Sequence, residues 1–123
     1  MKKPEINLSI PRFKEVDGHF HPAPFLLTEE MFGGVSIEIA GGEISELVGK
    51  PVANMHTHDV PEIYLLFSPE KGGAKIQVDI EEEEFIVDSP ATIYIPAGMR
   101  HRFITLEAIK GSYCLGVLLN DNH

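Results

Sequence analysis

Short, strand-sized runs between glycines and prolines constrain the fold of this chain more than any other feature. The 123 residues include 11 glycines and 9 prolines. Between them lie runs rich in Val, Ile, Tyr, Phe and Thr, and several of these runs alternate apolar and polar residues as half-buried strands do. Many short strands separated by turn signals predict an all-β sandwich or barrel. The predicted strands cover residues 35–39, 43–48, 62–67, 74–80, 84–87, 91–95, 101–105 and 112–119.

The length predicts a single domain, because 123 residues can bury one core but not two. A single helical turn is expected near residues 28–31, where Thr28 could cap it. Residues 1–32 hold four prolines and are predicted to form an extended N-terminal arm packed on the barrel edge. Residues 33–123 are predicted to form the barrel.

The arm is rich in large apolar side chains, and burying each would contribute about 1.5–3 kcal/mol. We therefore expect a homodimer in which the arm packs partly on the partner, since closed two-fold pairs are the commonest assembly. The alternative is an arm that closes one end of its own barrel. The side chains concerned are Ile6, Leu8, Ile10, Phe13, Phe20, Phe25, Leu26 and Leu27.

Charge and hydropathy exclude two classes of partner. The formal net charge of −9 disfavours nucleic acid, whose phosphates select basic surfaces. No apolar run approaches the roughly 20 residues of a membrane-spanning helix. The two N-terminal lysines are not followed by an apolar signal region, so a cytoplasmic location is expected. These features leave a small molecule as the expected partner.

Two local features are expected to be structural. The acidic run at residues 81–84 is predicted to be a solvated turn between two strands, because like charges repel and seek water. Cys114 stands alone in an apolar stretch, so it cannot form an intrachain disulfide. It is expected to be a small buried hydrophobe.

Histidine spacing carries the chemical signal. His56 and His58 lie two residues apart, so on a strand both would point to one face and could hold one ion. Glu62 follows a short turn and could add an anionic ligand. His101 follows the turn Pro-Ala-Gly-Met-Arg and could reach the same ion as a fourth ligand. Imidazoles combined with a carboxylate suit first-row transition metals.

The segments HTHDVPE and PAGMRH resemble the two signature motifs of the cupin superfamily, and the resemblance covers roughly residues 33–119. It implies a double-stranded β-helix, or jelly-roll barrel, with a metal inside. The metal ligands implied are His56, His58, Glu62 and His101. The cofactor implied is one divalent transition metal (Fe, Mn, Ni or Zn).

Strand parity then predicts which side chains line the interior. If Glu62 faces the metal, Tyr64 and Leu66 face inward too. On the strand that begins at His101, Phe103 is expected to point inward and Arg102 to solvent. Tyr64 is the candidate catalytic residue, as an acid, a base or an orienting group, although an ordinary barrel-lining aromatic fits the sequence as well.

A second His-x-His pair, His19 and His21, lies in the arm. No carboxylate follows it at matching spacing, so a surface or edge-strand role is favoured. The alternative is that one of the two reaches the barrel mouth and touches substrate. His123, the last residue, is not expected to take part.

Three functions remain open on the sequence. The first is a metal-dependent enzyme acting on a small oxygenated substrate, as an isomerase, epimerase, lyase or dioxygenase. The second is a non-catalytic module that binds or senses a small molecule. The third is a barrel in which the metal is only structural. Four protein ligands leave up to two positions open on a six-coordinate metal, which favours the first.

Overall fold

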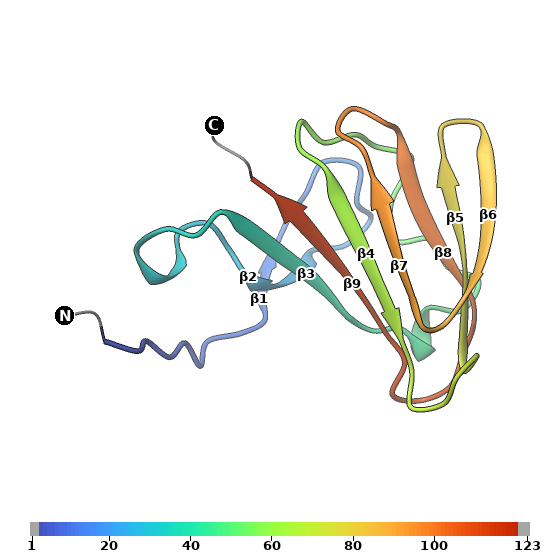
Figure 1. Cartoon of the computed structure of the whole chain (residues 1–123), viewed down its shortest axis with the longest axis horizontal. Coiled ribbons are helices and arrows are strands. Elements are labelled where there is room, and N and C mark those ends of the chain that lie inside the picture. The colour runs from blue at the N-terminus through green and yellow to red at the C-terminus, as the bar shows by residue number, and fades with distance from the viewer. Residues whose placement is uncertain (1–2, 121–123) are drawn as a thin grey trace.

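A computed structural model describes residues 3–120 (Figure 1). No helix in this range is long and apolar enough to cross a membrane. The described chain forms nine strands and two short 3₁₀ helices: β1 (Arg12–Lys14), β2 (Ala23–Leu27), η1 (Met31–Gly33), β3 (Ile37–Glu43), η2 (Ser45–Leu47), β4 (Glu62–Phe67), β5 (Ala74–Ile80), β6 (Glu83–Asp88), β7 (Ala91–Ile95), β8 (His101–Ala108) and β9 (Tyr113–Leu119).

The strands form two antiparallel sheets. The larger sheet has the order β1-β2-β3-β9-β4-β7, and the smaller sheet has the order β6-β5-β8. Figure 1 shows the three strands of the smaller sheet gathered on one side of β4 and β7, with β1 and β2 beyond β3 on the other. The arrangement confirms the all-β prediction.

The core lies between the two sheets. Alternate residues of β4 are buried, namely Glu62, Tyr64 and Leu66, as strand parity predicted. Ile76 and Val78 of β5 belong to the same buried cluster as Leu66 of the other sheet, and all three are almost fully buried. These aliphatic contacts fix the spacing of the sheets, and thereby the distance between residues at their ends.

One predicted strand is wrong. Residues 43–48 do not continue as a strand, because β3 ends at Glu43 and the chain enters η2. The Glu43 carboxylate accepts hydrogen bonds from the backbone nitrogen and hydroxyl of Ser45, both at 2.7 Å, and from the backbone nitrogen of Gly111. A side-chain acceptor that satisfies nearby backbone donors turns the chain away from the sheet.

Two turns are also displaced. The helical turn expected at residues 28–31 lies at Met31–Gly33, where Phe32 and Gly33 adopt positive φ. The acidic turn is confined to residues 81 and 82, since Glu83 already begins β6. The whole acidic run is exposed, and Glu81 pairs with Arg100 at 3.0 Å.

Cys114 is buried, as predicted.

The second half of the arm is part of the larger sheet. β2 pairs with β3, and β1 continues the sheet as its edge strand. The residues before β1 run outward from the sheets (Figure 1). Ile6 and Leu8 in that segment are 83% and 87% exposed, and Phe13 of β1 is also largely exposed.

The homodimer stays a prediction, and these exposed side chains define its test. Light scattering at micromolar concentration is expected to give twice the chain mass of 13.6 kDa, because apolar side chains beside a free strand edge favour association. The double variant Ile6→Ser/Leu8→Ser is expected to shift the mass toward the monomer. The control Ile86→Ser, an exposed aliphatic on β6, is expected to leave the dimer intact. A monomeric wild-type protein would show the prediction wrong.

Candidate metal centre

The first two predicted ligands lie in a loop, not on a strand. His56 and His58 fall in the irregular segment between η2 and β4, which corrects the expectation of a strand. This loop is held in place by backbone hydrogen bonds to the start of β8. The nitrogen of His56 donates to the His101 oxygen at 3.1 Å, and the nitrogen of His101 donates to the His56 oxygen at 2.9 Å. Proline at positions 51 and 61 works against a regular strand here.

The other two predicted ligands begin strands in different sheets. Glu62 is the first residue of β4, and His101 is the first residue of β8. The turn before His101 is tied to the histidine loop, because the nitrogen of Gly98 donates to the His58 oxygen at 2.9 Å. Two sheets and one loop therefore meet where these residues lie.

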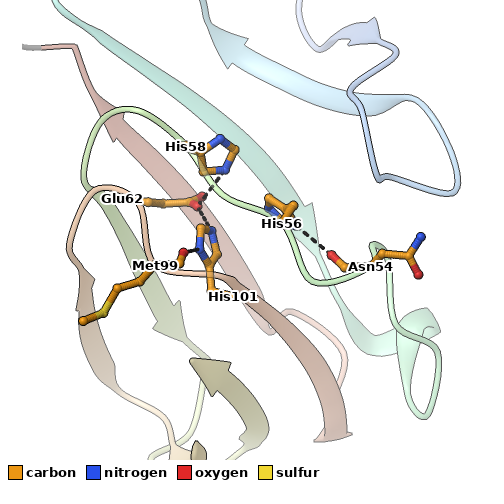
Figure 2. Close-up of polar contacts among 6 residues, drawn as sticks. All are labelled: Asn54, His56, His58, Glu62, Met99 and His101. Carbon is orange, nitrogen blue, oxygen red and sulfur yellow. Dashed lines mark hydrogen bonds and ion pairs between the residues drawn. The ribbon is translucent and has the colours of Figure 1, made fainter. Parts of the chain in front are cut away.

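The four side chains converge. One ligand atom from each of His56, His58, Glu62 and His101 lies within 4.8 Å of all the others. Oε1 of Glu62 lies 2.7 Å from Nε2 of His101 and 3.3 Å from Nε2 of His58, as the dashed lines in Figure 2 show. His101 and Glu62 are buried, and the other two are half-buried.

Backbone carbonyls orient two of the imidazoles. Nδ1 of His56 lies 2.8 Å from the Asn54 oxygen, and Nδ1 of His101 lies 2.8 Å from the Met99 oxygen (Figure 2). A carbonyl only accepts, so Nδ1 carries the hydrogen in both rings. In a neutral ring Nε2 is then the nitrogen with a free lone pair, the form that binds metals.

The ionisation of the site follows from its contacts. Burial opposes the charged form of Glu62, but the hydrogen bonds from His101 and His58 outweigh it and lower its pKa to about 2. Burial also opposes the charged form of His101, yet the contacts with Glu62 and Met99 raise its pKa. The pKa of His56 is lowered, mainly by burial. Glu62 is thus an anion beside a histidine that holds its proton.

A cavity of about 190 Å³ adjoins the cluster, and its walls are largely apolar. Tyr64 and Phe103 both line it, which places them where strand parity predicted. Their rings lie 5.4 Å apart, and the Tyr64 ring lies 6.0 Å from that of His101. Burial, with Glu62 nearby, raises the Tyr64 pKa well above its ordinary value, so its hydroxyl stays protonated.

Arg102 is only partly where it was expected. It follows His101 on β8 and pairs with Asp79 of β5 at 3.0 Å, and its side chain is 31% exposed. Solvent was predicted to surround it. The carboxylate of Asp79, itself nearly buried, binds the guanidinium, and Arg102 also lines the cavity beside the cluster.

Three further residues belong to the site. His19 and His21 of the arm both line the cavity, which agrees with the alternative that an arm histidine reaches the barrel mouth and not with the favoured surface or edge-strand role. Gly116 of β9 faces Glu62, and a Cβ at this position would collide with the carboxylate oxygen Oε2. A glycine inside an otherwise apolar strand marks a close approach, and this was the available signal. His123 lies outside the described residues.

The donor set fits a divalent metal. Metal–ligand bonds of about 2.0–2.2 Å place two ligands up to about 4.4 Å apart, close to the spacing observed here. Three imidazoles with one carboxylate are donors that Fe, Mn, Ni and Zn accept. The cluster can therefore hold one such ion.

Comparison with known proteins identifies the fold but not the activity. No family model and no curated protein matches the sequence. Three solved structures illustrate the likeness. A putative ethanolamine utilization protein Q from Salmonella typhimurium shares 21% identity over 89% of this chain and 80% of its own, with a TM-score of 0.62. A cupin superfamily protein from Desulfitobacterium hafniense shares 12% identity over 80% of this chain and 76% of its own, with a TM-score of 0.60.

The third, an RmlC-like cupin from Shewanella frigidimarina, shares 7% identity over 100% of this chain and 95% of its own, with a TM-score of 0.61. At sequence identities this low, the structural likeness supports a shared fold and does not support a shared function. The sheet order and the position of the histidine cluster agree with what the two sequence motifs implied. The chain therefore has the all-β fold of the cupins, with a His-His-Glu-His cluster that can hold a metal ion.

Proposed function

We propose that the protein is a metal-dependent enzyme acting on a small molecule that offers two adjacent oxygens to the metal. The observation that carries this proposal is the position of the four-ligand cluster beside an apolar cavity. A purely structural metal would not need a cavity next to it. On a metal that takes six ligands, such as Mn, four protein ligands also leave up to two positions open for a substrate.

The buried ionic pair supports a resident metal. Glu62 is a nearly buried anion, and leaving such a charge uncompensated is costly. In this structure the proton of His101 compensates it. A divalent cation can replace that proton, and His101 and Glu62 then both become ligands. Bound metal polarises an oxygenated substrate as a Lewis acid.

The cavity limits the substrate. Its volume of about 190 Å³ lies below the 300–1,000 Å³ typical of drug-sized sites, which favours a molecule of few heavy atoms. A divalent ion with one carboxylate retains a net positive charge, which favours an anionic oxygen ligand. The hydroxyl of Tyr64, protonated and at the cavity wall, is the group we assign to donating a hydrogen bond to the bound molecule.

The enzyme proposal is tested by turnover. We expect protein loaded with Fe, Mn, Ni, Co or Zn to convert at least one member of a panel of 2-hydroxy acids, 2-oxo acids and sugars, assayed with and without oxygen. Chelation and His58→Ala should abolish the activity, whereas Tyr64→Phe should lower kcat more than it weakens binding. Loaded protein that binds panel members without converting any would contradict the enzyme proposal and favour a sensing or binding module.

The role of Gly116 gives a test that needs no substrate. Gly116→Ala places a methyl group against the Glu62 carboxylate, so metal affinity should fall by at least about tenfold, a loss that repositioning a ligand commonly causes. Gly42→Ala is the matched control, because a Cβ at Gly42 meets no atom within 4 Å and its φ is not positive. Calorimetric titration of metal into both variants measures the difference. Equal affinities would show that Gly116 does not make room for a ligand.

A further inference from the structure

We propose that His19 hydrogen-bonds the bound substrate at a third oxygen, beyond the two that face the metal centre. This assignment rests on the proposed function and adds the class of molecule that the site selects. The substrate would be a small polyhydroxylated acid. It would present a carboxylate and its adjacent hydroxyl to the metal, and a further hydroxyl to the arm.

The backbone holds His19 firmly at the site. The nitrogen of Phe20 donates to the Val52 oxygen at 3.0 Å, and the nitrogen of Asn54 donates to the Gly18 oxygen at 2.8 Å. These bonds flank the bridge between His19 and Ala53. The arm therefore runs alongside the segment that leads into His56. Backbone hydrogen bonds on both sides of an isolated β-bridge hold His19 there, so its position does not depend on its side chain alone.

The ring of His19 lies against the cluster without belonging to it. Its centroid is 4.9 Å from that of His56, and both rings line the same cavity. Yet His19 is not among the four residues whose ligand atoms come within 4.8 Å of one another. A position beside the ligands, on the cavity wall, suits a contact with substrate better than a fifth bond to the metal.

The nitrogens of His19 have different surroundings. Nδ1 is buried and has no hydrogen-bond partner among the described residues. Because Nδ1 is enclosed by protein, Nε2 is the nitrogen through which His19 can reach a ligand. Val16, Phe25 and Val52 are among the apolar residues that line the same cavity. Arg102, which also lines it, is paired with Asp79 at 3.0 Å.

A largely apolar cavity with few polar side chains, each at a fixed place, discriminates between close analogues. A site built to bond a hydroxyl rejects a molecule that lacks it, since the polar group is then left unpaired. His21 also lines the cavity but is exposed, so water satisfies it in either case. His19 is thus the arm residue expected to set specificity.

The test uses glycerate and lactate, which share a carboxylate and a 2-hydroxyl and differ by the 3-hydroxyl. Calorimetry of the Mn-loaded protein, whose metal takes six ligands, is expected to show glycerate binding roughly threefold to tenfold more tightly, the usual net effect of one hydrogen bond. His19→Ala should remove this preference without changing lactate affinity or metal content. His19→Gln, which keeps a side-chain donor and acceptor, should retain part of it, and His21→Ala all of it.

Three results would overturn the assignment. The first is equal binding of the two acids by wild-type protein, and the second is a preference that survives in His19→Ala. The third is loss of metal in His19→Ala, which would make His19 a ligand. Wild-type protein that holds no metal would overturn the proposed function itself, and its metal content distinguishes that failure from the other three.

Discussion

The contact between Glu62 and His101 joins the two sheets and decides the character of the site. Glu62 comes from β4 in the larger sheet, His101 comes from β8 in the smaller one, and their side chains meet at 2.7 Å in a nearly buried position. Neither charge is stable there alone, because each would lose its hydration without a partner. Together they keep a carboxylate ionised and an imidazole protonated at the end of an apolar cavity.

Much of the nearby structure follows from accommodating this pair. Gly116 lacks a side chain where the Glu62 carboxylate needs room. The carbonyl of Met99 fixes the ring of His101, and backbone pairing between His56 and His101 brings the histidine loop to β8. The apolar core between the sheets holds the two strand ends at a constant separation. A metal that replaces the shared proton would thus meet ligands already in place, which lowers the cost of organising the site.

The sequence predicted what depends on local pattern and spacing. The ranges 62–67, 74–80 and 91–95 match β4, β5 and β7, because Gly, Pro and alternating apolar residues mark their limits. The motifs placed Glu62 and His101 at strand starts. The strand predicted at residues 43–48 was wrong, because a hydrogen bond between Glu43 and Gly111, which lies far along the chain, helps to end the strand at Glu43. For His19 the sequence favoured a surface or edge-strand role and left the barrel mouth only as an alternative, since its place at the cavity depends on pairing with Ala53 and not on its own neighbours.

The central claim is that His56, His58, Glu62 and His101 bind one divalent ion together. X-ray absorption of the Zn-loaded protein tests it most directly, because the fine structure reports the ligands themselves. We expect nitrogen and oxygen ligands at about 2.0–2.2 Å, with the scattering pattern of three imidazoles, and loss of one imidazole in His58→Ala. A sulfur ligand, or a spectrum with a single imidazole that His58→Ala leaves unchanged, would contradict it.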